Sequence, residues 1–497
     1  MFTEKQSGAG YHIYRRNNNM QAFNPYLPNF EYVPDAEPRV FNGRLYVYGS
    51  HDAFGGADFC VNDYVCWSAP LDDLGNWQYE GVIYKSVQDP KSKNGKRRMC
   101  APDAVKGPDG RYYLFYEFAD LTVTSVAVCD EPAGKYEFYG WVHRKDGSVY
   151  GEKKGEVNLF DPGVLVDDDG SIYFYTGFSP ADGFLKKVMG MRGLKIDGGY
   201  VIELEADMLT MKDEPRFLIP GPDKAIGTSF DGHGFFEASS IRKIGGIYYF
   251  VYSSVLSHEL CYAASKSPDK DFVYGGTLVS IGDIGYKGNT TPVNYTGNTH
   301  GGMVCVNGQW YIFYHRQTNK QKCARQGCAE KIFINEDGSI DQAEITSCGL
   351  NNGPLKGEGT YESRIACNLS SAEGTFAYLK TREKDKKKLH PYFTQSGADR
   401  EDNPDQYIAN MKDGAAAAFK YFEFEGLNEI SVTVRGKGSG KLEVRTEKGP
   451  IAEIALEPSD SWGSFSGKVS AEVSGTHALY FTYKGSGYID FKNFTLG

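Results

Sequence analysis

The stretch PDAEPRVFNGRLYVYGS, from Pro34 to Ser50, consists of a polar start, a short apolar segment, a glycine turn and a second segment rich in alternating aromatic residues. This pattern predicts a β-hairpin. Four similar phrases follow, and five copies of one hairpin in a single chain indicate an internal repeat. The other copies are APDAVKGPDGRYYLFYEF from Ala101, FDPGVLVDDDGSIYFYTGF from Phe160, FFEASSIRKIGGIYYFVYSS from Phe235 and THGGMVCVNGQWYIFYHR from Thr299.

Each repeat has a polar anchor residue at its start and a glycine at its turn. The turn glycine follows the anchor after 7 to 9 residues, and the anchors are 58 to 76 residues apart: Asp35, Asp103, Asp161, Glu237 and His300. A unit of about 60 residues has room for two further strands, and four strands make one blade of a β-propeller. The sequence therefore predicts an all-β fold with a five-bladed β-propeller over residues 1–350, whose anchors converge on the central axis. A large β-sandwich with unrelated hairpins is the alternative.

The repeat fades after Ile340, and the second half of the chain has a different pattern. Residues 349–360, GLNNGPLKGEGT, have the composition of a linker. Alternating segments return near Lys420 and predict a β-sandwich (jelly-roll) domain over residues 351–497. These segments are KYFEFEG, EISVTVRG, KLEVRTEKG, AEIALEP, HALYFTYKG and YIDFKNFTL.

Composition narrows the range of partners. A chain of 497 residues with a formal net charge of −10 is a poor candidate for nucleic acid, whose binding depends on Lys and Arg. Aromatic residues make up 14% of the chain, which suits stacking on sugar rings. Because no apolar stretch approaches the roughly 18 residues of a membrane span, no membrane association is expected. The oligomeric state stays open.

The cysteines and the N-terminal residues indicate the cellular location of the protein. Ten cysteines without a C-x-x-C pair predict reduced, mostly buried thiols rather than structural zinc. The polar start, MFTEKQSGAGYHIYRRNNNM, has no apolar signal-peptide core. We therefore expect a cytoplasmic protein, unless a signal has been removed.

Converging carboxylates point to acid–base chemistry. Crowding raises the pKa of some members and keeps others ionised, which glycoside hydrolysis requires. Glu237 follows Phe235 and Phe236, and this apolar setting favours a raised pKa. Asp103 lies in an Ala-Pro-Asp turn, where a structural role competes with direct chemistry. His300 fits either an axial calcium or water site, or an ordinary hydrogen-bonded histidine.

On these motifs, over about residues 22–348, the sequence resembles glycoside hydrolase family 43. The resemblance implies a five-bladed propeller that inverts the anomeric configuration. It implies that Asp35 is the general base, Glu237 the general acid, and Asp161 the carboxylate that tunes and orients the acid. One departure is Ala36-Glu37 after the base, where Gly-Glu is expected.

Further residues carry over from the same resemblance. Arg325 matches an arginine that reaches into the sugar pocket, and Asp103 an aspartate near the active site. His300 matches a histidine beside an axial calcium ion or water cluster. We expect His51 and Asp52, which follow the first hairpin, to contact the substrate. No cofactor is expected to be required for the chemistry.

The ending HALYFTYKGSGYIDFKNFTLG resembles the last strands of family 6 carbohydrate-binding modules. That resemblance places Asp490 near a structural calcium ion. Trp462 and Tyr407 are candidates for sugar stacking, with core packing as the alternative for each. The domain could also have lost sugar binding and instead brace the propeller or shape its pocket.

These observations lead to a functional hypothesis. We expect an exo-acting hydrolase that releases α-L-arabinofuranose from arabinan or arabinoxylan oligosaccharides. A β-xylosidase acting on xylo-oligosaccharides is the close alternative, and endo-acting arabinanase fits short oligosaccharides less well. A non-catalytic sugar-binding propeller is the alternative of a different class. A transferase or phosphorylase is disfavoured because no glycine-rich phosphate cradle is present.

Overall fold

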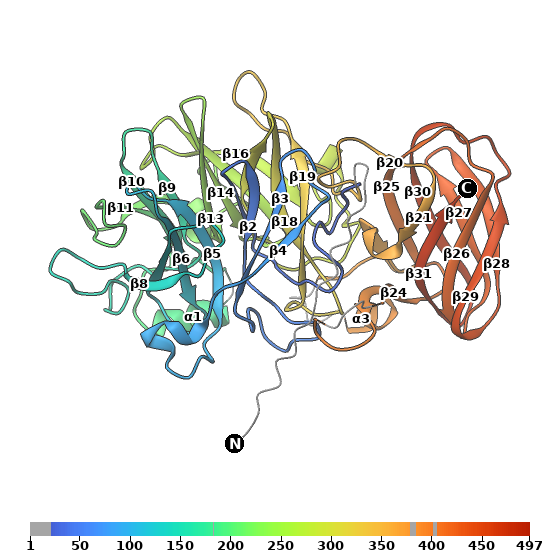
Figure 1. The fold of residues 1–497 in the computed structure, drawn as a ribbon, viewed down its shortest axis with the longest axis horizontal. Helices are drawn as coiled ribbons and strands as arrows, with labels where there is room; N and C mark the ends of the chain where they lie inside the picture. The colour runs from blue at the N-terminus through green and yellow to red at the C-terminus, as the bar shows by residue number, and fades with distance from the viewer. Residues whose placement is uncertain (1–20, 182, 378–383, 401–404) are drawn as a thin grey trace.

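The computed structural model describes residues 21–181, 183–377, 384–400 and 405–497. The polar N-terminal stretch that bears on location therefore lies outside the described residues. The fold is all-β, as predicted, with two groups of sheets that lie side by side (Figure 1). Strands from residues 37–332 form the group on the left, coloured from blue to yellow, and strands from residues 355–496 form the orange and red group on the right.

The first group contains five separate antiparallel sheets in chain order. The first two sheets are β1 (Glu37–Phe41), β2 (Arg44–Tyr48), β3 (Tyr64–Pro70) and β4 (Gln78–Tyr84), then β5 (Met99–Lys106), β6 (Tyr112–Phe118), β7 (Thr124–Cys129) and β8 (Glu137–Trp141). The third and fourth are β9 (Gly163–Val166), β10 (Ile172–Gly177), β11 (Gly198–Leu204) and β12 (Arg216–Pro220), then β13 (Phe235–Ile244), β14 (Ile247–Ser254), β15 (Glu259–Ser265) and β16 (Val273–Ser280). The fifth is β17 (Met303–Val306), β18 (Gln309–Gln317) and β19 (Arg325–Ile332).

The five predicted hairpins are confirmed as the first two strands of these five sheets. The prediction of four strands per unit is wrong for the fifth sheet, which ends with β19. After β19 the chain makes only isolated bridges, between Ile334 and Ile340 and between Ala343 and Val279 of the fourth sheet. It then enters the C-terminal group, so the residues expected to complete the fifth unit form the connection instead.

The first strands of the five sheets contact one another in a closed cycle, in the order β1, β5, β9, β13, β17 and back to β1. A parallel bridge between Ala36 and Gly301 joins the two ends of the cycle. Strands β9 and β13 lie very close together, because a Cβ atom on Gly163 of β9 would lie 2.7 Å from the Ser239 carbonyl oxygen of β13. A glycine is therefore needed where these two strands meet.

Hydrophobic clusters fill the five spaces between neighbouring sheets, again in a closed cycle. Alternate residues of each second strand face opposite neighbours, so these strands are apolar on both faces. Members of the five clusters, from the first–second interface to the fifth–first, include Tyr48 with Tyr116, Phe115 with Phe174, Tyr175 with Phe250, Tyr249 with Ile312, and Val47 with Phe313. The aromatic segments of the repeats thus hold the sheets together.

The C-terminal group consists of two six-stranded sheets around one hydrophobic cluster. One sheet contains β20 (Leu355–Lys356), β22 (Asn368–Ser370), β25 (Ala416–Phe424), β27 (Ser439–Thr446), β28 (Gly449–Leu456) and β30 (Gly475–Ser486). The other contains β21 (Gly359–Glu362), β23 (Tyr392–Gln395), β24 (Gln406–Met411), β26 (Glu429–Gly436), β29 (Ser459–Lys468) and β31 (Ile489–Leu496).

Six strands of this group match the segments predicted from residue 420 onwards, and the others were not predicted. The linker interpretation of residues 349–360 is wrong, because Leu355 is fully buried and pairs with Phe422 of β25. Strand β29 carries a serine- and glycine-rich sequence along the edge beside β26, with little apolar alternation to reveal it.

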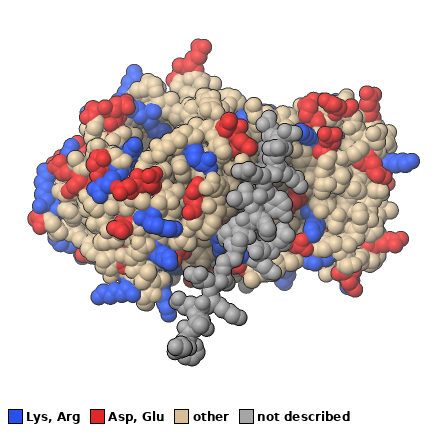
Figure 2. Space-filling model, viewed as in Figure 1, with Lys and Arg blue, Asp and Glu red and all other residues tan. Residues whose placement is uncertain are grey.

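Helices are few among the described residues. They are α1 (Gly183–Met191), α2 (Pro222–Ala225) and α3 (Lys384–Leu389), with 3₁₀ turns at η1 (Ser86–Gln88), η2 (Pro90–Ser92), η3 (Tyr286–Gly288) and η4 (Ser363–Ile365). Within the described ranges, no helix has the length and apolar character needed to cross a membrane. The ten cysteines are free thiols, and seven of them are buried. On the face shown in Figure 2, basic and acidic side chains are interspersed over both groups of sheets.

Candidate active site

Three carboxylates that are far apart in the sequence meet where the first strands begin. Asp35 lies two residues before β1, Asp161 two residues before β9, and Glu237 near the start of β13. The backbone N–H of Ala238 donates to Asp161 Oδ2 at 2.9 Å, and His300 Nδ1 lies 3.5 Å from the same oxygen. We call Asp35, Asp161, Glu237 and His300 the axial cluster.

Local backbone conformation helps to aim these side chains. Asp35 and Asp161 have left-handed φ angles of 55° and 52°, and Ala238, directly after Glu237, has a φ of 71°. Non-glycine residues seldom adopt this region, although aspartate does so more readily than most. Strained backbone of this kind is concentrated at functional sites.

Asp35 is held in its ionised form. Burial disfavours its charge, but the guanidinium of Arg325 and the other polar groups around it together outweigh this cost and lower the pKa of Asp35. Arg325 Nη1 donates to Asp35 Oδ1 at 2.7 Å, and both side chains are almost completely buried. A carboxylate that stays charged at neutral pH can accept a proton from water, as a general base must.

His315 supports Asp35 from the other side. Burial, together with the charge of Arg325, lowers the pKa of His315 to about 3, so its imidazole is neutral at neutral pH. Its Nε2 lies 2.8 Å from the Asn298 carbonyl oxygen, and its Nδ1 accepts the Asp35 backbone N–H at 3.4 Å. These partners fix the tautomer with the proton on Nε2.

Glu237 is in the opposite protonation state. Burial, followed by the charges of Asp161 and Asp35, raises the pKa of Glu237 well above its ordinary value. Its side chain keeps partial contact with solvent, unlike Asp35 and Asp161, which are each 4% exposed. A protonated carboxyl group that a ligand can reach has the properties of a general acid.

Asp161 interacts with a further carboxyl group that the sequence analysis missed, Glu117 at the end of β6. Burial, followed by the charge of Asp161, raises the pKa of Glu117 well above its ordinary value. Neither Glu117 oxygen receives a hydrogen bond from a donor among the described residues. Because this raised pKa favours the protonated form, Glu117 is an uncharged neighbour of Asp161.

Three of the predicted sugar-contacting residues, Arg325, Asp52 and His51, have buried polar partners within the protein. Arg325 donates from Nε to Asp52 Oδ2 at 2.8 Å and from Nη2 to Asp52 Oδ1 at 3.1 Å. The Cys60 backbone N–H also donates to Asp52, and His51 Nε2 lies 3.0 Å from Glu31 Oε1. Since Arg325, Asp52 and His51 are almost fully buried, the structure favours positioning over sugar contact for these three.

Asp103 lies between the first strands, as predicted, but its partners are Arg39 of β1 and Val164 of β9 rather than members of the axial cluster. Asp103 is fully buried, and Arg39 Nη2 and Nε donate to its carboxylate at 2.6 to 3.1 Å. The Val164 N–H occupies its second oxygen at 2.7 Å. Ala101, which has a positive φ of 28°, takes the position in the second sheet that Asp35 and Asp161 take in the first and third.

The two calcium expectations differ in how well their residues fit the ion. A Ca²⁺ ion takes six to eight oxygen ligands. At His300 the neighbouring carboxylate is Asp161, so an ion there would take most of its ligands from water. Asp490 instead pairs with Arg435 Nε at 3.2 Å and accepts the Asn410 N–H at 3.1 Å. The guanidinium supplies the positive charge that an ion would bring, which disfavours calcium at Asp490.

Trp462 and Tyr407 lie in the same region of the C-terminal group. The Arg435 guanidinium lies 4.3 Å from the Trp462 ring centre and 4.7 Å from that of Tyr407. The two rings also contact each other edge to face, with their centres 5.2 Å apart. Their faces are therefore used in packing and cation–π contacts, which favours the core-packing alternative.

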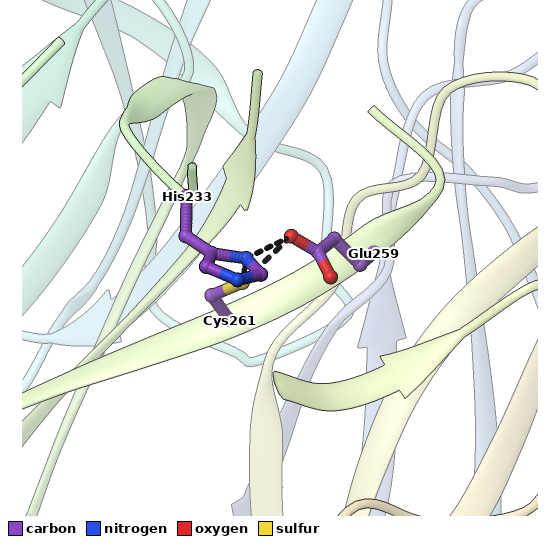
Figure 3. Close-up of side chains that lie close together, drawn as sticks. All are labelled: His233, Glu259 and Cys261. Atoms are coloured by element: carbon purple, nitrogen blue, oxygen red, sulfur yellow. Dashed lines mark hydrogen bonds and ion pairs between the residues drawn. The ribbon is translucent and has the colours of Figure 1, made fainter. Parts of the chain in front are cut away.

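A second polar cluster lies at the fourth sheet, where Glu259 and Cys261 of β15 meet His233, which precedes β13 (Figure 3). Their ligand atoms lie within 4.8 Å of one another, close enough to hold a metal ion. The Glu259 carboxylate already has hydrogen-bond partners: His233 Nδ1 at 2.7 Å, Ser254 Oγ at 2.6 Å and Thr277 Oγ1 at 3.0 Å. Hydrogen bonding therefore accounts for this cluster without a metal.

Glu259 should make stability depend on pH. Burial opposes its ionisation, but hydrogen bonds from His233 and Ser254 outweigh it and lower the pKa of Glu259 to about 2. A depressed pKa gives stability that is present above the ordinary value and is lost as pH falls towards the folded value. Glu259→Gln should therefore lower the free energy of unfolding by about 3 kcal/mol at pH 7 and by less than half of that at pH 3.

Denaturant unfolding at the two pH values measures this effect, with the exposed Glu457→Gln as the control. An equal penalty for Glu259→Gln at pH 3 and pH 7 would contradict the assignment.

Comparison with known proteins places these features in a family. A sequence profile of glycosyl hydrolases family 43 matches residues 24–340. The chain is 50% identical over 481 residues to a xylosidase/arabinosidase of Thermoclostridium stercorarium, covering 96% of this chain and 99% of that relative. A solved family 43 enzyme from Xanthomonas citri, complexed with xylotriose, is 25% identical with a TM-score of 0.52, covering 65% of this chain and 94% of that chain.

A family 43 arabinoxylan arabinofuranohydrolase from Bacillus subtilis, solved with cellotetraose, is similar in fold along nearly the whole length. It covers 95% of this chain and 97% of that chain, with a TM-score of 0.50 and 22% identity. The profile match spans more than half of the chain, and the Thermoclostridium relative matches nearly all of it. The chain therefore belongs to glycosyl hydrolases family 43 and is a glycoside hydrolase.

Proposed function

We propose that this protein is an inverting, exo-acting hydrolase that releases α-L-arabinofuranose from arabinan or arabinoxylan oligosaccharides. One observation carries the proposal: within a single cluster, Asp35 has a lowered pKa and Glu237 a raised one. Glycoside hydrolysis needs this pair, with one carboxyl group ionised and the other protonated.

The proposed reaction assigns one task to each carboxyl group. Asp35 removes a proton from water as the water oxygen attacks the anomeric carbon. Glu237 gives its proton to the leaving sugar oxygen as the glycosidic bond breaks. Asp161 accepts a hydrogen bond from the backbone N–H of Ala238, the residue after Glu237. Its negative charge raises the pKa of Glu237 and so favours the protonated acid. In an inverting enzyme the base and acid stand about 6.5–9.5 Å apart, with the water between them.

The proposal includes a five-bladed β-propeller over residues 1–350 and a β-sandwich domain over residues 351–497. The closed cycle of first strands and the five inter-sheet clusters support the propeller. The separate hydrophobic cluster of the C-terminal sheets supports a second domain. We propose that this domain is related to family 6 carbohydrate-binding modules and has a mainly structural role.

The choice between arabinose and xylose rests on relatives. The Thermoclostridium relative is named for both activities, as xylosidase/arabinosidase. We therefore propose β-xylosidase activity on xylo-oligosaccharides as the alternative in the same pocket. The chemistry requires no cofactor, although a hydrated calcium ion at His300 is compatible with the proposal. Neutral oligosaccharides are the proposed partners, without nucleic acid or membrane, and the cytoplasm is the proposed location.

Hydrolysis of p-nitrophenyl α-L-arabinofuranoside and β-D-xyloside tests the proposed function. We expect turnover of at least one of them, and ¹H NMR of the first-formed sugar should show the anomer opposite to that of the substrate. Binding without turnover would favour a non-catalytic sugar-binding propeller. A first-formed anomer that matches the substrate would contradict inversion.

A further inference from the structure

Beyond the axial cluster, the C-terminal group reaches the segment that holds the proposed base. We propose that Asp399 and Arg400, between β23 and β24, are positioning residues for the hydrolytic reaction and act on Asp35 through residues 51–62 and Arg325. The inference rests on the proposed function, because it assigns a task to the C-terminal group in that same reaction.

Asp399 fixes the loop that follows His51 and Asp52. Its Oδ1 accepts the Phe54 backbone N–H at 2.7 Å, and its Oδ2 lies 3.5 Å from Asn62 Nδ2. Asn62 in turn donates to the Asp52 carbonyl oxygen at 3.0 Å. One carboxylate from the C-terminal group thus contacts both ends of the loop from Ala53 to Asn62.

Arg400 enters a buried polar site beside the first sheet. Its Nη1 donates to Glu31 Oε1 at 2.6 Å and lies 3.0 Å from His51 Nε2. Glu31 is 2% exposed and also accepts the Trp67 indole N–H at 2.9 Å. Burial opposes the charge of Glu31, but His51 and Arg400 outweigh it and lower the pKa of Glu31. Without Arg400, this buried carboxylate would lose its guanidinium partner.

The same loop holds the groups that orient Asp35. The Cys60 N–H and the Arg325 guanidinium together occupy both oxygens of Asp52. The Phe59 ring lies 4.6 Å from the Arg325 guanidinium, and Arg325 donates to Asp35 at 2.7 Å. Residues 51–62 are therefore held between Asp399 and Arg400 on one side and Arg325 on the other.

An ordinary contact between the two groups of sheets is the competing explanation, and the chain offers a matched control for it. Lys420 of β25 donates to Glu344 at 2.8 Å and lies 3.5 Å from Asp283. This ion-pair cluster is also largely buried and also joins the two groups. No contact of Lys420 recorded among the described residues involves residues 51–62, Arg325 or Asp35.

The experiment compares kcat, KM and thermal stability for Asp399→Ala, Arg400→Ala and Lys420→Met in the full chain. We expect Asp399→Ala and Arg400→Ala each to lower kcat by about tenfold or more on the aryl glycoside, with KM changed less than about threefold, because misplacing a reacting group costs rate rather than binding. Lys420→Met should lower the melting temperature about as much as the two alanine variants do, but its kcat should stay within about twofold of the wild-type value.

Conservative variants sharpen the comparison. Asp399→Asn keeps an acceptor oxygen for the Phe54 N–H, and Arg400→Lys keeps one charged donor for Glu31. Both should recover most of the lost kcat. The inference is overturned if the alanine variants keep wild-type kcat, or if Lys420→Met loses as much kcat as they do. Failure of the wild type to hydrolyse either aryl glycoside would instead overturn the proposed function.

Discussion

Replacing Glu237 with glutamine should lower kcat on an arabino- or xylo-oligosaccharide by about 10³- to 10⁴-fold, the upper part of the range for a lost general acid. Glutamine keeps the shape of the side chain but has no acidic proton. A sugar leaving group needs that proton because its alkoxide is strongly basic. Steady-state kinetics on a defined oligosaccharide measure the loss.

The leaving group provides an internal control for this variant. A dinitrophenolate is a weak base and departs without a proton, so kcat for a dinitrophenyl glycoside should fall far less than kcat for the oligosaccharide. Equal losses on both substrates would remove Glu237 from the acid role. Activity within tenfold of wild type on the oligosaccharide would do the same.

Replacing Asp35 with alanine should lower kcat by about 10³-fold or more on every substrate, whatever its leaving group. The base acts on water, and the need for water activation does not depend on the leaving oxygen. The variant also removes a charge that Arg325 now pairs with at 2.7 Å. Comparing kcat for the oligosaccharide and the dinitrophenyl glycoside measures the effect.

Azide supplies the control for the Asp35 variant, because it is a nucleophile that needs no base. In the space left by the carboxylate, azide should attack the anomeric carbon and form a carbon–nitrogen bond as the leaving oxygen takes the Glu237 proton. The product should be a glycosyl azide of inverted configuration. A glycosyl azide of retained configuration would contradict the assignment of Asp35 as the base.

Much of the fold was predictable because it is local. A glycine turn between apolar segments specifies a hairpin, and each hairpin was found where its sequence predicts it. Asp35, Asp161 and Glu237 could be located because repeats place equivalent residues at equivalent points of a cyclic arrangement. The number of strands in the fifth sheet could not be predicted, because residues 333–350 do not continue the repeat and instead connect the two groups of sheets.

The spacing of the repeats predicts that Asp103 lies further along its strand than the other anchors do. The other anchors precede their turn glycines by 8 or 9 residues, whereas Asp103 precedes Gly110 by 7. A shift of two residues in a strand keeps the side chain on the same face but moves it about 6.6 Å along the strand. The residue 9 before Gly110 is Ala101, which occupies the anchor position.

The polar residues at the ends of the aromatic segments could also have been predicted to lie near the site. In a hairpin the second strand ends beside the start of the first, so polar residues at the ends of the aromatic segments lie next to the anchors. Five such residues are completely buried, which marks them as a set: Ser50, Glu117, Thr176, Ser253 and His315. The contacts of Arg325 with Asp35, and of Arg400 with Glu31, join residues 290 and 369 positions apart, and no local pattern reveals them.

The most direct test of whether crowding leaves Asp35 ionised and Glu237 protonated is the pH dependence of kcat/KM. It is measured on one oligosaccharide for the wild type and for Glu237→Gln. The wild type should give a bell, rising as Asp35 ionises at low pH and falling at higher pH as Glu237 loses its proton. Glu237→Gln should keep the rising limb and lose the falling one. A falling limb that persists unchanged in Glu237→Gln would contradict the account.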